Sequence, residues 1–200
     1  MMSYAIIGFG KIGQALAHAF ARKNIEVAVA SRRPAEALAP QAREIGPMVV
    51  ATSLRDALEA DTIILAVPFG EHRAVAKALP KWDGKTIIDA MNAFPVPEEF
   101  DGLPSSAFVA KSFNGAKFVK GFNHLVAATL AADPVVEGGH RVVFLSSDDE
   151  DAVAPVAALA KQLGFAPVKL GKLNEGGALV HARGRTWGQL FFQDLFKKEQ

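Results

Sequence analysis

A glycine-rich turn close to the N-terminus constrains the fold of this chain more than any other feature. The apolar run Tyr4–Ile7 predicts a strand buried on both faces, and the motif G-x-G-x-x-G follows it directly at Gly8–Gly13. Apolar residues at helical spacing then predict a helix that ends at Arg22, and Val27–Ala30 predicts a second buried strand. Strand, glycine turn, helix and strand at this spacing are typical of the first unit of a dinucleotide-binding fold.

The glycines of this motif have distinct expected roles. Gly8 makes the tight turn, Gly10 lets the backbone approach a pyrophosphate, and Gly13 lets the helix pack closely on the strand. The unpaired N–H groups and the positive dipole end of the helix favour phosphate at the same place. We therefore predict that the whole turn binds the cofactor, through Gly8, Phe9, Gly10, Lys11, Ile12 and Gly13.

The residues after the second strand predict which dinucleotide binds. An NAD site usually carries Asp or Glu about 20 residues after the glycines, bonded to the ribose 2′-hydroxyl. Ser31, Arg32 and Arg33 stand there instead, so no carboxylate would repel a 2′-phosphate. A guanidinium donates to phosphate in a planar fork, and the serine hydroxyl adds a donor. We predict NADP(H); the alternative is that the two arginines belong to an ordinary solvated turn.

The alternation of strands and helices continues along the chain and predicts the fold class. Further apolar strands are expected at 48–51, 62–67, 86–90 and 117–122, separated by segments with helical patterns. This order predicts an α/β protein with a Rossmann-type, doubly wound, mostly parallel sheet. We assign the dinucleotide-binding domain to residues 1–122 and a small C-terminal α/β extension, for substrate binding or dimerisation, to residues 123–200.

Ligands of such sheets bind beyond the carboxyl ends of the strands, which selects further candidate residues. Val67, Pro68 and Phe69 lie at the end of one predicted strand, and we predict that they contact the cofactor. The alternative is that Pro68 only ends the strand and Phe69 caps the core. Asn92 follows the next strand, where its side chain either orients the nicotinamide end or bonds to its own turn.

Charge and composition exclude several classes of function. The formal net charge is +1, so we predict no nucleic-acid partner and no membrane partner. The chain has no cysteine, which excludes disulfides, thiolate metal sites and a cysteine nucleophile, and we predict no metal site. No secretory leader is expected, and no apolar run reaches the roughly 18 residues of a membrane-spanning helix. We predict a cytoplasmic protein.

Apolar residues of the C-terminal tail predict a terminal helix. One face of such a helix would carry Trp187, Leu190, Phe191, Asp194 and Leu195. This face either packs on its own domain or pairs two copies of the chain. We predict a homodimer formed through this aromatic helix.

Several segments together resemble a known family. They follow one another in the family's order and cover nearly the whole chain: GFGKIG at 8–13, ASRR at 30–33, ILAVP at 64–68, IIDAMN at 87–92, AKFVKGFN at 116–123, SSDDEDA at 146–152 and LGF at 163–165. With these segments the chain resembles the deazaflavin-dependent NADP reductases (coenzyme F420:NADP oxidoreductases), to which the ferrireductase domains of certain metalloreductases are related. The V-K-x-F-N segment is the more discriminating one, because many dehydrogenases share the glycine motif.

The resemblance implies hydride transfer between NADPH and a flavin-like acceptor, either F420 or a flavin. Such a transfer needs two rings at contact distance more than it needs acid–base groups, and we predict no catalytic side chain. Asn123 and His124, expected at the start of a helix, are the positions assigned to substrate near the nicotinamide; the alternative for the histidine is a structural role. The tail departs from the family pattern, which leaves a free flavin, a quinone or an iron chelate as alternative acceptors.

Two other functions remain open at this point. Reduction of an imine or a keto group would require a larger helical C-terminal region with a proton donor. A non-catalytic NADP(H)-binding sensor or scaffold protein would keep the glycine turn and the arginine pair, and would bind a protein partner through the aromatic tail.

Overall fold

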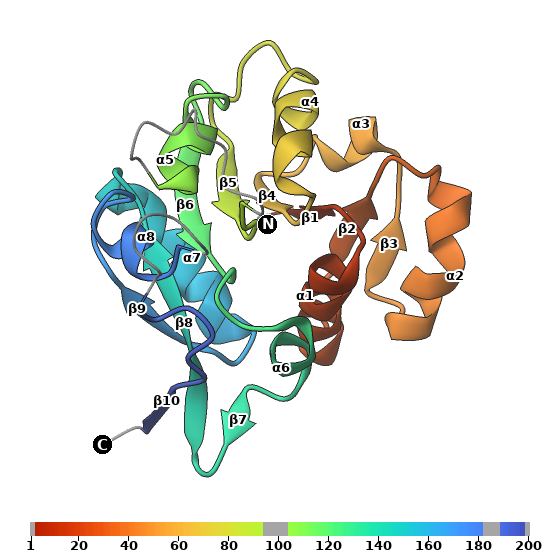
Figure 1. Ribbon diagram of the computed structural model, residues 1–200. Helices are drawn as coiled ribbons and strands as arrows, with labels where there is room; N and C mark the ends of the chain where they lie inside the picture. The colour runs from red at the N-terminus through yellow and green to blue at the C-terminus, as the bar shows by residue number, and fades with distance from the viewer. Residues whose placement is uncertain (1–2, 94–103, 182–188, 199–200) are drawn as a thin grey trace.

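A mostly parallel β-sheet runs through the centre of the protein, with helices packed on both faces (Figure 1). The structure is a computed structural model, and it describes residues 3–93, 104–181 and 189–198. In these residues the strands are β1 (Tyr4–Ile7), β2 (Val27–Ala30), β3 (Val49–Ala51), β4 (Thr62–Leu65), β5 (Thr86–Asp89), β6 (Lys117–Gly121), β7 (Val135–Val136), β8 (Gly139–Ser146), β9 (Ala166–Lys169) and β10 (Phe196–Lys198).

Helices connect most of these strands. They are α1 (Lys11–Arg22), α2 (Ala35–Ile45), α3 (Leu54–Ala57), the 3₁₀-helix η1 (Phe69–Glu71), α4 (His72–Ala76), α5 (Ser105–Ala110), α6 (Ala127–Ala131), α7 (Glu150–Gln162) and α8 (Gly176–Leu179). The predicted strands and the helix before β2 agree closely with these bounds, because each is a contiguous segment with a clear apolar pattern.

The strand order confirms the predicted doubly wound class. The sheet runs β10-β8-β6-β5-β4-β1-β2-β3 in the described residues, and all neighbours from β6 to β3 are parallel. The chain leaves β1 toward β2 and β3 on one side and returns to β4 on the other. The order therefore reverses between β1 and β4, and the turns after these two strands meet at the switch point where such folds bind ligands.

The two faces of the sheet are buried under different helices. One apolar cluster contains Leu16 and Phe20 of α1, Leu130 of α6 and Leu159 of α7. The other lies under α3, α4 and α5 and includes Trp82, whose indole N–H donates to the Ala76 carbonyl over 3.1 Å. Because strands between β6 and β3 are covered on both faces, they read as continuous apolar runs.

The C-terminal region extends the same sheet. β8 pairs antiparallel with β6, and β9 pairs parallel with β8, so the predicted α/β extension is present as a continuation of the central sheet. The domain boundary at residue 122 stays a prediction.

The prediction of an aromatic helix at the C-terminus is wrong for the described residues. Residues 189–192 form turns, and β10 pairs antiparallel with Gly139–Arg141 of β8, as the dark blue strand in Figure 1 shows. Asp194 accepts from Arg141 Nε over 2.7 Å, and the Val142 N–H donates to Leu195 O over 2.7 Å. Trp187 lies outside the described residues. In the described residues, the helix through which the homodimer was predicted to form is therefore absent.

A second correction concerns the start of α6. This helix begins at Ala127, with Val126 as its N-cap residue, so Asn123 and His124 do not open a helix. Both side chains are instead buried, because the chain crosses the end of the sheet here before it reaches the helix.

Candidate functional site

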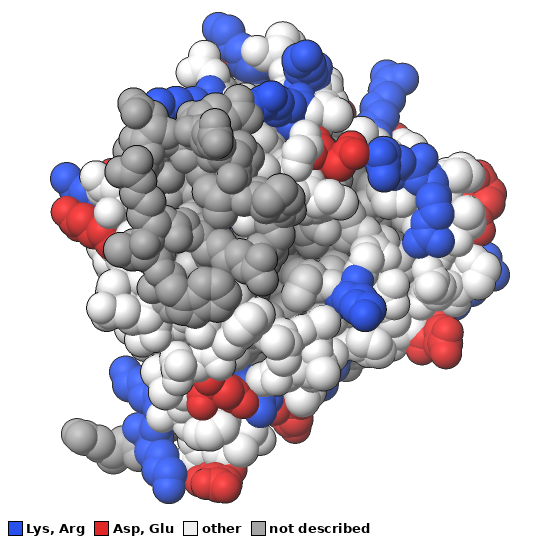
Figure 2. Space-filling view, in the orientation of Figure 1, with Lys and Arg blue, Asp and Glu red and all other residues white. Residues whose placement is uncertain are grey.

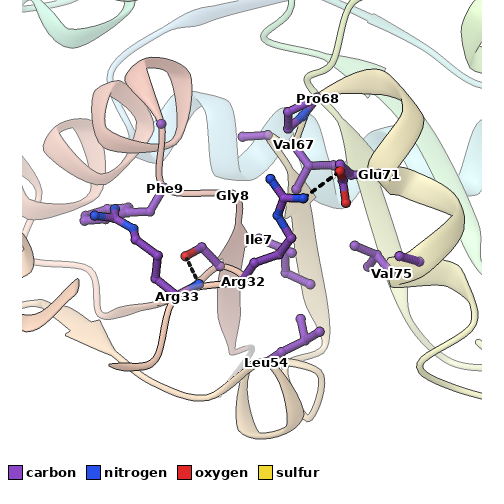
Figure 3. A pocket seen from close by; sticks show the side chains of 14 residues that line it. Ile7, Gly8, Phe9, Arg32, Arg33, Leu54, Val67, Pro68, Glu71 and Val75 are labelled. Carbon is purple, nitrogen blue, oxygen red and sulfur yellow. Dashed lines mark hydrogen bonds and ion pairs between the residues drawn. The ribbon is translucent and has the colours of Figure 1, made fainter. Parts of the chain in front are cut away.

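A cavity of about 410 Å³ lies at the switch point, at the carboxyl ends of β1, β2 and β4 (Figure 3). Among the predicted site residues, it is lined by Gly8, Phe9, Gly10, Ser31, Arg32, Arg33, Val67 and Pro68. Three segments far apart in the sequence therefore form one concave site. Apolar side chains complete its wall, and they are Ile7, Leu54, Ala66, Ala74 and Val75.

The glycine turn is shaped by close approaches of the backbone. A Cβ on Gly8 would lie 2.3 Å from Ala66 O, and one on Gly13 would lie 1.9 Å from Gly8 O. Gly8 also has φ +103°, which disfavours other residues. Thus Gly8 joins the turns after β1 and β4, and Gly13 brings α1 onto β1, as the motif predicts.

Gly10 has a different environment. A Cβ there would meet no atom within 4 Å, and the residue lines the cavity as the N-cap of α1. No side-chain hydrogen bond caps this helix at its N-terminus. Open space and a helix N-terminus together fit a phosphate group that approaches the backbone. Lys11 and Ile12 belong to this first turn.

The segment after β2 places its polar groups at the mouth of the cavity. The Arg33 N–H donates to Ser31 Oγ over 3.0 Å, and Arg33 Nη2 donates to Gln41 Oε1 over 3.2 Å. Arg32 Nη1 reaches Glu71 Oε1 at 2.9 Å, as the dashed line in Figure 3 shows. Since the Arg32 side chain is 81% exposed, this surface ion pair is weak, and the guanidinium can turn toward an anion.

Phe69 lies away from the cavity. Its ring packs against His72, with centroids 4.9 Å apart, and against Phe108 of α5 at 6.5 Å. His72 is fully buried and its Nδ1 hydrogen-bonds the Phe69 carbonyl. Of the three residues predicted after β4, only Val67 and Pro68 line the cavity.

Asn92 and Asn123 bond to each other across the carboxyl ends of β5 and β6. Asn92 Nδ2 donates to Asn123 O over 2.9 Å, and Asn123 Nδ2 donates to Asn92 Oδ1 over 3.0 Å. Asn123 Nδ2 also donates to Val180 O over 2.8 Å. The two residues thus form one contact, although they lie outside the cavity wall. Asn92 bonds across to the neighbouring strand end, which differs from the alternative of a bond to its own turn.

His124 is fully buried against Phe144, with ring centroids 4.7 Å apart. Burial lowers its pKa from 6.5 to about 4, while the Asp194 carboxylate and a Val142 backbone bond act in the opposite direction. The imidazole is therefore neutral at pH 7. Its assignment to substrate stays a prediction.

Three charged residues in or near the site were not predicted from the sequence. Glu71 was not predicted, because only the fold brings it to Arg32. Asp89 and Lys120 were not predicted either, although a charged residue inside the apolar segments IIDA and FVKG is a visible signal. Each is 1% exposed in the structure.

Charged side chains are dispersed over the face of the molecule shown in Figure 2. Lys and Arg side chains lie mostly along its upper and right-hand parts, with Asp and Glu side chains among them.

In the described residues, no helix is long and apolar enough to cross a membrane.

Comparison with known proteins finds a family match in the N-terminal part of the chain. Residues 3–93 match the family described as NADP oxidoreductase, coenzyme F420-dependent. A candidate F420-dependent NADP reductase of Arthrobacter sp. FB24 has the same fold, with a TM-score of 0.73 and 27% identity over 86% of each chain. The family match covers β1 to β5, the strands that surround the cavity at the switch point.

Two further relatives extend the comparison. A hypothetical protein of Sinorhizobium meliloti is 41% identical, with a TM-score of 0.91, over 99% of this chain and 97% of its own. The metalloreductase STEAP2 of Mus musculus is 31% identical over 86% of this chain. The chain spans about a third of the length of this metalloreductase, 34%.

Proposed function

We propose that this protein is an oxidoreductase that binds NADP(H) in the cavity at the switch point and exchanges hydride with a flavin-like acceptor, F420 or a flavin. One observation carries the proposal: the glycine turn, the Ser31–Arg33 segment and Val67-Pro68 line the same cavity. The match of residues 3–93 to an NADP oxidoreductase family supports the same cofactor.

Different residues of the cavity suit different parts of the cofactor. The first turn of α1 and the open space at Gly10 suit the pyrophosphate. Arg32, Arg33 and the Ser31 hydroxyl suit the 2′-phosphate, because guanidinium groups donate to phosphate in a planar fork. Leu54 and Val75 offer apolar surface for the adenine ring.

Bound NADPH would supply a hydride, and the protein would supply position. Direct transfer between two stacked rings requires contact distance and the exclusion of water more than proton transfer. The lining of the cavity agrees with this requirement. Its acidic side chain, Glu71, forms an ion pair with Arg32.

The first experiment is a titration of the protein with NADPH and with NADH, followed by nicotinamide fluorescence. Replacing both Arg32 and Arg33 by glutamine should weaken NADPH by about 1.5–3 kcal/mol for each charged hydrogen bond lost. NADH has no 2′-phosphate and should bind as before. Arg43→Gln, on the exposed last turn of α2, is the matched control.

Equal weakening of both cofactors would contradict the 2′-phosphate assignment. An NADPH oxidation assay with F420, flavins, quinones and ferric chelates then identifies the acceptor. Tight NADPH binding with no turnover on any of these would favour the non-catalytic sensor or scaffold.

A further inference from the structure

A buried ion pair joins the carboxyl ends of β5 and β6. Asp89 and Lys120 lie opposite each other in the parallel register, and Lys120 Nζ lies 3.2 Å from Asp89 Oδ2. Both side chains are 1% exposed. Burial lowers the pKa of Lys120, while the Asp89 charge and hydrogen bond oppose that shift. An apolar pair would often stabilise such a position equally well, because two buried ions lose their hydration. Stability alone therefore explains this pair poorly.

The ion pair holds both backbone polar groups of Met91. Asp89 Oδ1 accepts from the Met91 N–H over 2.9 Å, and Lys120 Nζ donates to the Met91 carbonyl. Two side chains on neighbouring strands thus orient the turn that follows β5. A backbone bonded on both sides by charged groups has little freedom to move, since charge-assisted hydrogen bonds are the strong ones.

The next residue extends this arrangement. Asn92 exchanges two hydrogen bonds with Asn123, which also binds Val180 O. Asn92 is half-buried, whereas Asp89 and Lys120 are not accessible. The buried charged pair therefore bonds to the inner side of this turn. The next residue of the turn, Asn92, is partly exposed at the ligand-binding edge of the sheet.

This turn lies on the half of the sheet opposite to the arginine pair. A doubly wound sheet binds a dinucleotide across the switch point, with one mononucleotide on each half. The segment after β2 occupies the adenosine half, so the ends of β4, β5 and β6 belong to the nicotinamide half. We propose that Asp89 and Lys120 are positioning residues, which hold the Met91–Asn92 turn in place for the nicotinamide end of NADP(H).

The proposal rests on the proposed function and can be separated from it by a truncated ligand. Adenosine 2′,5′-bisphosphate carries the adenosine half of NADPH without the nicotinamide. Lys120→Met should bind this ligand like the wild type, but should bind NADPH about tenfold more weakly, as expected if contacts at the nicotinamide end are lost. The turnover number should fall about 100-fold, the effect of a displacement near 1 Å.

Two controls separate positioning from a general loss of stability. Lys117→Met is the same substitution on the same strand at an exposed position, and it should change neither affinity. The double variant Asp89→Asn/Lys120→Met removes the unpaired buried carboxylate left by the single change, and should show the same selective loss. Wild-type affinity ratios and turnover in both folded Lys120 variants would overturn the proposal.

A measurement on the unmodified protein covers the case in which these variants do not fold. Methionine methyl groups labelled with ¹³C report on four residues, Met1, Met2, Met48 and Met91. The Met91 signal should shift with NADPH and not with adenosine 2′,5′-bisphosphate; a Met91 signal unmoved by bound NADPH would overturn the inference alone. Failure of the wild type to bind either ligand would instead overturn the proposed function, and the inference with it.

Discussion

At the scale of single residues, the two outer glycines of the turn and the central one serve different purposes. Gly8 and Gly13 are required by the protein itself, since a Cβ on either would lie within 2.3 Å of a backbone oxygen. Gly10 has open space and an ordinary φ of −83°, so the fold alone does not require glycine there. A bound ligand would explain that choice.

This difference gives a prediction for two alanine variants. Gly10→Ala should fold with a loss of at most about 1 kcal/mol from the N-cap preference, and should weaken NADPH by about 1–3 kcal/mol through overpacking of the site. Gly13→Ala should lower the free energy of unfolding by more, because α1 must move away from β1. Urea unfolding and NADPH titration of both variants measure the two effects. A Gly10→Ala protein with unchanged NADPH affinity would speak against a phosphate at this position.

At the scale of secondary-structure elements, α3 shows how a short helix is held beside the site. The Ser53 side chain accepts from the Asp56 N–H over 3.1 Å, and its hydroxyl donates to Asp56 Oδ2 over 2.7 Å. Ser53 is the N-cap residue of this helix. A helix of four residues has few hydrogen bonds of its own, so its stability depends on this cap.

We expect Ser53→Ala to reduce the free energy of unfolding by about 1 kcal/mol, the usual value of an N-cap side chain. NADPH affinity should fall modestly as well, because Leu54 of this helix lines the cavity. Ser53→Thr keeps the oxygen and serves as the control. Thermal unfolding with and without NADPH checks both parts. An alanine variant as stable as the threonine variant would show that the cap contributes nothing.

At the scale of the whole molecule, the buried His124 couples folding to pH. Its pKa is about 4 in the folded protein and 6.5 without burial, so the unfolded chain binds more protons between these values. Stability therefore rises with pH in this window and is lost as the pH falls. From these two pKa values, the loss between pH 7 and pH 5 is about 2 kcal/mol.

Urea unfolding at pH 7 and pH 5 measures this loss. His124→Phe should remove most of it, since a phenyl ring can pack against Phe144 without titrating. His18→Gln, on the exposed side of α1, should leave the pH dependence as it is. If the phenylalanine variant loses as much stability at pH 5 as the wild type, another group causes the acid sensitivity.

The sequence by itself determined the parts of the protein whose contacts are local. Tyr4–Ala30 forms a strand, a glycine turn, a helix and a strand over one contiguous segment, and the nearby Ser31–Arg33 follows directly. The periodicity of apolar residues and the steric demands of glycine act within such segments. The fold class and the residues around the turn could therefore be predicted before the structure was known.

Only the tertiary structure decided the contacts between segments that lie far apart in the chain. The tail from Leu190 matched a helical pattern, but the edge of β8 offered backbone groups that β10 satisfies by pairing. Likewise, Arg32 meets Glu71, and Lys120 meets Asp89, across 39 and 31 residues. No local pattern encodes such pairings, because they depend on which strands become neighbours and which side chains that arrangement buries.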